Sequence, residues 1–146
     1  MLELNSIAVE PDLAENGMWA EYMGGRFLIA RRGPRYQARL VELYQENMDL
    51  VKSNTPEGDE KSLDIFRQAF SDTVLLDWEG ITENGKPLPY SKKAGHELMK
   101  NPRLFELTNF LESFSNNHTN YQLKVEEEAA QEVQSPADSS LSTPQR

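Results

Sequence analysis

The spacing of apolar residues changes at Gly33-Pro34. Before this point, Gly24-Gly25 stands between two runs rich in apolar residues, 18–23 and 26–31. Two glycines with such flanks predict a β-hairpin, because glycine readily adopts the positive φ angles of a tight turn. Scattered apolar residues within 4–9 predict a third strand beside this hairpin.

After that point, apolar residues recur at every third or fourth position, which is the spacing of an amphipathic helix. A first helix is expected over residues 34–53. Thr55 is a suitable N-cap for a second helix that ends near Gly80. Ser91 and Asn101-Pro102 are similar starting points for two further helices.

Between the second and third of these helices, Asn84-Gly85 predicts a tight turn, and two prolines downstream exclude a central strand. This segment is expected to be a hairpin-like loop that packs Trp78 and Tyr90 onto the helices. The whole pattern predicts an α+β fold. A small N-terminal antiparallel β-sheet or hairpin over residues 1–33 is followed by about four α-helices over residues 34–121.

The composition changes again at Gln122. Residues 122–146 contain no aromatic residue, carry the acidic run Glu126-Glu127-Glu128, and end in a stretch rich in Ser, Pro and Gln. Such a segment buries too little apolar surface to offset the entropy lost on folding. We therefore expect a single globular domain over 1–121 and then a disordered, flexible, low-complexity acidic tail. The alternative role of the tail is a tether or a partner-binding segment.

The composition excludes several classes of protein. The chain contains no cysteine, which rules out disulfides, thiolate catalysis and cysteine-based metal sites. No apolar run approaches the roughly 20 residues that span a bilayer, and the first residues do not resemble a secretory signal. With 24 acidic and 15 basic side chains, the net charge of −9 disfavours nonspecific binding to nucleic acid. A cytoplasmic protein that binds neither membrane nor nucleic acid is expected.

Residues suited to catalysis or metal binding are few. Asp77 and Glu79 are spaced to share a Mg²⁺ ion in an extended segment, but carboxylates at such positions are more often solvated. No ligand pattern surrounds His96 or His118, and no phosphate-binding or nucleophile motif occurs. The sequence therefore predicts a protein that is not an enzyme, with no catalytic residue, metal or cofactor.

Positive charge is concentrated in one stretch of this acidic chain. No acidic residue lies between Tyr22 and Val41. The same stretch contains five arginines: Arg26, Arg31, Arg32, Arg35 and Arg39. Their functional interpretation is a patch for an acidic partner segment or, against the overall charge, for nucleic acid. The alternative is pairing within the chain, with the acidic segment 57–72 or with the tail.

A second candidate surface involves aromatic residues. Along residues 104–114, apolar side chains fall on more than one side of the expected helix, which is typical of deep burial or of a groove for a partner. A protein of this size offers little room for deep burial on all sides. We therefore expect a partner-binding groove around four aromatic residues: Trp78, Phe105, Phe110 and Phe114.

The order of several short motifs resembles the phage tail assembly chaperone family. Residues 74–81 read Val-Leu-Leu-Asp-Trp-Glu-Gly-Ile, similar to the Trp-Glu-Gly-Val/Ile segment that ends a helix in that family. Residues 84–91, Asn-Gly-Lys-Pro-Leu-Pro-Tyr-Ser, resemble its turn, aromatic residue and serine cap. Asn101-Pro102 resembles the start of its next helix. The similarity extends over about residues 15–121 and is most specific at 74–105.

This resemblance implies a non-enzymatic tail assembly chaperone of a tailed bacteriophage. Such proteins bind the tape-measure protein in the host cytoplasm, assist polymerisation of the tail-tube protein around it, and are absent from the mature virion. No catalytic residue is carried over, because the family is not typified by any; Trp78 and Gly80 match its pattern and can be purely structural. The alternative is a small structural or adaptor protein retained in the phage tail. Self-association is left open.

Overall fold

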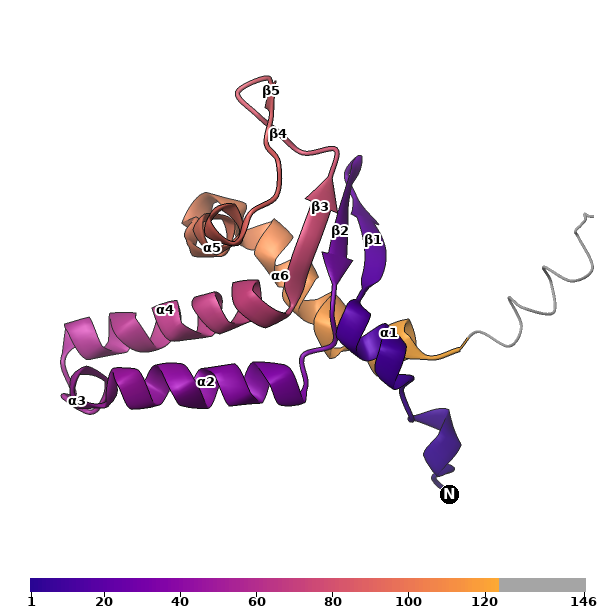
Figure 1. Cartoon of the computed structure of the whole chain (residues 1–146), viewed down its shortest axis with the longest axis horizontal. Coiled ribbons are helices and arrows are strands. Elements are labelled where there is room, and N and C mark those ends of the chain that lie inside the picture. Colours follow the sequence, from indigo (N-terminus) through magenta and orange to yellow (C-terminus); the bar gives the residue numbers. More distant parts are fainter. Residues whose placement is uncertain (124–146) are drawn as a thin grey trace, which may run out of the picture.

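The computed structural model of the chain describes residues 1–123 (Figure 1). Of the tail predicted over 122–146, all but the first two residues lie outside this part. The described part has six α-helices: α1 Pro11–Asn16, α2 Pro34–Glu46, α3 Met48–Val51, α4 Pro56–Thr73, α5 Lys92–Lys100 and α6 Phe105–Asn116. It has three 3-10 helices: Leu4–Ser6, Pro102–Leu104 and His118–Tyr121. Its strands are β1 Met18–Tyr22, β2 Gly25–Ile29, β3 Leu75–Glu79, β4 Thr82–Glu83 and β5 Lys86–Pro87.

The strands are not confined to residues 1–33, so the predicted arrangement of the α+β fold was wrong. β1 and β2 pair as an antiparallel hairpin, but β3, which follows α4, completes a sheet in the order β1-β2-β3. β4 and β5 form a second, two-stranded sheet. The helical spacing of Phe66 and Phe70 continues through Val74 to Trp78, so the local pattern extends the helix over β3. The segment is nevertheless a strand, because it pairs with β2, which lies far away in the sequence.

Six helices replace the four expected, and the two additional helices, α1 and α3, are short. The first expected helix is divided at Asn47, which separates α2 from α3 with φ −124° and ψ 25°. The expected strand over 4–9 is not formed, and Pro11 begins α1. Proline is favourable at the first helical position because its missing N–H group would lack a helical partner in any case.

Two of the predicted helix starts are confirmed as N-caps, whereas Asn101 caps the 3-10 helix Pro102–Leu104 and not α6, which begins at Phe105. Thr55 Oγ1 accepts a hydrogen bond from the Gly58 N–H at 3.1 Å at the start of α4. Ser91 Oγ accepts one from the Ala94 N–H at 3.0 Å at the start of α5. Both oxygens satisfy a backbone donor that the first turn of a helix leaves without a partner.

The two predicted tight turns are also present. In the first hairpin, Met23 and Gly24 have φ angles of 50° and 91°, so the turn lies one residue earlier than the glycine pair indicated. Asn84-Gly85 joins β4 to β5 as expected, with φ angles of 55° and 79°. Positive φ at both central positions matches the right-handed twist of the paired strands.

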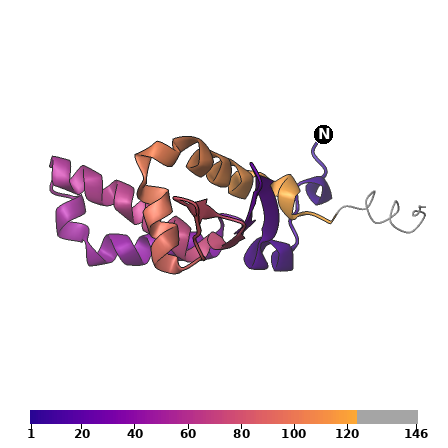
Figure 2. The same cartoon turned by 90° about the horizontal axis from the view of Figure 1, so that it is seen from above.

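The helices α2 to α5 lie on one side of the three-stranded sheet and α6 packs against β2, whereas α1 lies near the start of β1 (Figure 1 and Figure 2). α2 runs away from the sheet, and α4 returns beside it after the turn through α3. The residues at the centre of the core are each at most 1% exposed: Phe27, Ile29, Phe70, Leu75 and Leu111. α2 and α5 pack against α4, and the remaining side of α4 forms part of the surface described below.

Candidate partner-binding surface

Trp78 lies in the core. Its side chain is only 4% exposed, and its Nε1–H donates a hydrogen bond of 2.7 Å to the Leu88 carbonyl oxygen. The Tyr90 ring meets it edge-on, with ring centroids 5.2 Å apart, and the Phe27 ring lies 6.2 Å away. Trp78 therefore holds the loop after β3 onto the sheet, whereas the sequence predicted that this loop packs Trp78 and Tyr90 onto the helices.

Phe110 and Phe114 are half-buried on the inner side of α6. The Phe110 ring lies 4.8 Å from the Tyr22 ring of β1, and the Phe114 ring lies 5.9 Å from the ring of Tyr121. Tyr121 is fully buried, and its hydroxyl donates to the Ile29 carbonyl oxygen at 3.0 Å. These two phenylalanines thus pack α6 against the sheet and against the last 3-10 helix.

Phe105, the first residue of α6, is 71% exposed. The structure therefore does not bring the four predicted aromatic residues together. Trp78 lies in the core, Phe110 and Phe114 lie in the α6–sheet contact, and Phe105 alone projects to the surface. A phenylalanine at the surface is costly because its apolar area stays in water.

Phe105 lines a groove of about 490 Å³ between α4, the end of α5 and α6, called here the α4–α6 groove. Its apolar wall is formed by Leu63, Phe66, Met99, Pro102 and Phe105. Its charged residues are Arg67, Lys100 and Glu112. Leu63 and Phe66 follow the helical spacing of apolar residues, but Leu63 is 51% exposed. The sequence feature that could have identified Leu63 as a surface residue is its position at the edge of the apolar stripe of the helix.

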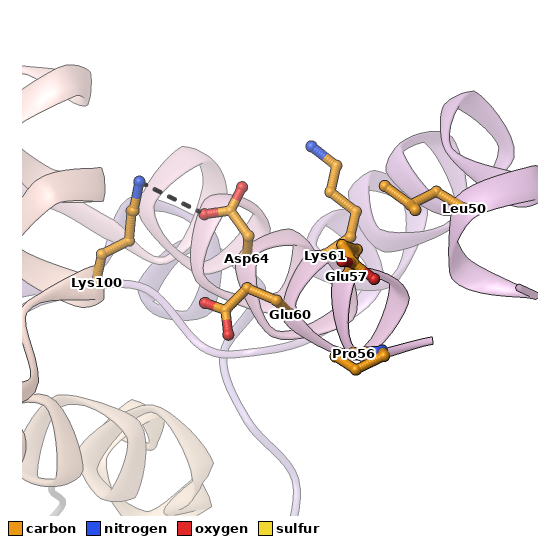
Figure 3. Close-up of a pocket in the computed structure, with 7 residues that line it drawn as sticks. All are labelled: Leu50, Pro56, Glu57, Glu60, Lys61, Asp64 and Lys100. Carbon is orange, nitrogen blue, oxygen red and sulfur yellow. Dashed lines mark ion pairs between the residues drawn. The ribbon is translucent and has the colours of Figure 1, made fainter. Parts of the chain in front are cut away.

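A second hollow, the α3–α4 hollow, adjoins this groove and shares Lys100 with it (Figure 3). It is lined by Leu50, Pro56, Glu57, Glu60, Lys61, Asp64 and Lys100. Asp64 Oδ1 lies 4.0 Å from Lys100 Nζ and 3.1 Å from His96 Nε2. The two hollows adjoin along α4, with apolar residues around Phe105 and charged residues of both signs in the α3–α4 hollow.

Glycine at position 58 allows α3 to pack against the start of α4. A Cβ atom at Gly58 would overlap the Leu50 carbonyl oxygen. Only a glycine therefore lets α3 pack this closely against the first turn of α4.

Glu112 is the charged residue of the α4–α6 groove with a perturbed titration. Burial raises the pKa of its carboxyl group, and the positive charges of Arg32 and Arg67 oppose this effect. The Glu112 carboxylate in the groove is thus partly desolvated, and the guanidinium groups of Arg32 and Arg67 stabilise its negative charge.

Two of the five predicted arginines, Arg26 and Arg39, form ion pairs of 2.9 Å or less, and a third, Arg35, pairs with Glu15 at 3.5 Å. Arg26 pairs with Glu79 at 2.7 Å and stacks over the Trp19 ring, with its Cζ 4.4 Å from the ring centroid. Arg39 pairs with Asp72 and with Glu42, both at 2.9 Å. Pairing within the chain therefore accounts for these two, and Arg39 is the one arginine of the five that reaches a carboxylate of segment 57–72 in the described residues.

The other three, Arg31, Arg32 and Arg35, line a pocket of about 290 Å³, called here the arginine pocket. Its remaining walls are Val9, Ala14, Glu15, Ala30, Gly33, Pro34 and Thr73. Arg35 lies 3.5 Å from Glu15, and both side chains are mostly exposed. Within residues 1–123, no carboxylate lies within ion-pair distance of Arg31 or Arg32.

Asp77 and Glu79, which are spaced to share a Mg²⁺ ion, have other contacts in the structure. Asp77 Oδ1 accepts a hydrogen bond from the Trp78 N–H at 2.8 Å, and Glu79 pairs with Arg26. Within residues 1–123, no group of three or more His, Cys, Asp or Glu side chains is arranged to hold a metal ion. None of the helices in the same part of the chain is long and apolar enough to cross a membrane.

The comparisons with known proteins give one family. A family model described as "YdaY prophage protein" matches residues 32–132, more than half of the chain. This match begins within the arginine stretch, covers α2 to α6, and ends beyond the acidic run that follows Leu123. No curated protein and no solved structure matches the chain. The chain therefore belongs to the YdaY prophage protein family and is phage-derived.

Proposed function

We propose that this prophage protein is a non-enzymatic tail assembly chaperone. It binds the tape-measure protein of its phage in the host cytoplasm, assists polymerisation of the tail-tube protein around it, and leaves before the virion is complete. Phage origin and the motif resemblance over 74–105 support this proposal. The observation that carries it is the α4–α6 groove, which presents Phe105 at 71% exposure beside other apolar side chains.

The groove suits the apolar face of a partner helix. An amphipathic helix binds such a groove through residues spaced three and four apart, and burial of its apolar face drives association. Phe105 and Leu63 would contact that face, because both are exposed at the groove.

The net charge of −9 fits the same role. A chaperone that carries exposed apolar residues must keep its client complexes apart in solution, and like charge on every copy does so by repulsion. The same charge disfavours nucleic acid as a partner.

The test is co-expression with the tape-measure protein encoded by the same prophage. We expect the long client to become soluble and to co-purify with this chain. Phe105→Asp should abolish both effects, because it places a charge in the apolar wall of the groove. Val41→Asp is the matched control, since Val41 is 54% exposed on α2 and lines none of the three hollows described above.

Two results would overturn the proposal. If the client stays insoluble and nothing co-purifies, this chain does not bind the tape-measure protein. If purified virions contain the chain in a fixed ratio to the tube protein, it is the structural or adaptor component instead.

A further inference from the structure

The arginine pocket contains more positive charge than the described residues neutralise. Three arginines line it, and its one carboxylate is Glu15. Arg31 Nη1 has a carbonyl oxygen as its partner, that of Ser115 at 3.4 Å, and Arg32 stacks over the ring of Tyr36 with its Cζ 5.3 Å from the ring centroid. Guanidinium groups form their strongest hydrogen bonds with carboxylates, so the pocket has the chemistry of a carboxylate-binding site.

The chain leaves the described part beside this pocket. The Tyr121 carbonyl oxygen accepts a hydrogen bond from the Glu10 N–H at 2.8 Å, and Gln122 Nε2 donates to the Ala8 carbonyl oxygen at 2.9 Å. Val9, the residue between these two anchor points, is part of the pocket wall. These hydrogen bonds therefore hold Gln122 at the edge of the arginine pocket.

The residues that follow carry the complementary charge. Glu126-Glu127-Glu128 begins three residues after Leu123. An extended chain spans up to about 3.5 Å per residue, so the chain length from Leu123 to these residues allows a reach of at most roughly 10 to 18 Å. A ligand on so short a tether has an effective concentration on the order of millimolar.

The family match includes the same acidic residues. It extends to residue 132, so it contains Glu126-Glu127-Glu128 together with Arg32 and Arg35, and it excludes 133–146. The region matched by the family model thus holds the negative segment and two of the three pocket arginines, but it leaves out Arg31 and the pocket residues before it.

We propose that the arginine pocket is a carboxylate-binding site and that its occupant is the acidic segment Glu126-Glu127-Glu128 of the same chain. Binding in cis closes the pocket to acidic segments of other proteins until this segment is displaced. The inference goes beyond the proposed function and does not depend on the identity of the client.

The first test compares the full chain with its E126Q/E127Q/E128Q variant by ¹⁵N–¹H correlation NMR. We expect the amide signals of residues 14–15 and 30–36 to shift in the variant, because the carboxylates no longer contact the pocket. High salt should move the wild-type signals in the same direction, since it screens the ion pairs. Asp138→Asn is the matched control, as it removes one acidic side chain outside the family match. Unchanged signals at 30–36 in the triple variant would overturn the proposal.

The second test measures binding of a labelled hexaglutamate peptide by fluorescence anisotropy. We expect the triple variant to bind it at least tenfold more tightly than the wild-type chain, because the competing segment is gone. An R31Q/R35Q pair added to the triple variant should remove that binding, whereas Arg103→Gln, which changes an exposed arginine outside the pocket, should not.

Each contrary outcome has a defined meaning. Equal affinity of the peptide for wild-type chain and triple variant would show that the segment does not occupy the pocket. No binding to either would show that the pocket is not a carboxylate site. NMR shifts that depend on protein concentration would assign the acidic segment to a second copy, which overturns binding in cis.

Discussion

Trp78 and Phe105 are both aromatic and both were expected in one partner-binding groove, but their surroundings differ completely. Trp78 is 4% exposed, its ring is bounded by Phe27 and Tyr90, and its indole N–H is hydrogen-bonded to Leu88. Phe105 is 71% exposed at the first position of α6. The contrast shows that two aromatic residues of the same family-like stretch, 74–105, can have different roles: one serves the fold and the other lies on the candidate surface.

The two residues should also differ in the effect that their substitution has on folding and on binding. Removing a buried ring costs the transfer free energy of its apolar atoms and leaves a cavity. Removing an exposed ring costs the folded domain little, and its effect appears when a partner covers it. Substitution of Trp78 should therefore mainly lower stability, and substitution of Phe105 should mainly weaken binding.

The largest effect is expected for Trp78→Ala. It should lower the free energy of unfolding by about 3–5 kcal/mol, because it empties the space below the β4–β5 loop and leaves the Leu88 carbonyl oxygen without its donor. Urea unfolding followed by circular dichroism measures the change. A loss below about 1 kcal/mol would show that Trp78 does not hold the loop in place.

Tyr121→Phe should have the next largest effect on stability. The hydroxyl of this fully buried residue donates to the Ile29 carbonyl oxygen, and its loss should cost about 1–3 kcal/mol. The ring remains, so packing against Phe114 is kept. Denaturation curves with an unchanged slope would assign the loss to this hydrogen bond, and an unchanged midpoint would contradict its contribution.

Phe105→Asp should leave the free energy of unfolding within about 0.5 kcal/mol of the wild type, as is usual for exposed positions. Its affinity for the client should fall at least tenfold, about 1.4 kcal/mol, because a carboxylate would be desolvated in the groove. Isothermal titration with a soluble client fragment gives the affinity. A stable variant that binds normally would exclude the α4–α6 groove as the client site.

The smallest effect concerns Glu112→Gln and pH. Burial raises the pKa of Glu112 in the folded chain, so between its ordinary value and this raised value the folded state holds more protons than the unfolded state. The free energy of unfolding then falls as pH rises through this window, and the glutamine variant should lack that component. Urea unfolding at a series of pH values compares the two chains. Parallel pH profiles would show that Glu112 titrates normally.

Local chemistry was sufficient to predict several features of the fold. Thr55 and Ser91 were predicted as N-caps, and both accept the expected hydrogen bonds, because capping depends on residues within one helical turn. The turn at Asn84-Gly85 was predicted for the same reason. The strand β3 was missed, because its pairing with β2 joins residues far apart in the chain.

The candidate surface could be predicted only in part. The five arginines were identified by their concentration, but the ion pairs of Arg26 and Arg39 involve Glu79 and Asp72, which later elements bring close. Phe105 was included with the aromatic residues of its helix, but nothing in the spacing distinguished it from Phe110. The direction each ring faces depends on how α6 lies on the sheet.

The sequence by itself determined the starts of α2, α4 and α5, the tight turns, the acidic charge and the residues available for binding, because these depend on residue type and on neighbours within a few positions. The tertiary structure decided which aromatic residues are buried, which arginines have partners, and where β3 pairs. Those outcomes are set by contacts between distant segments, whose free energy depends on the packing of the whole chain.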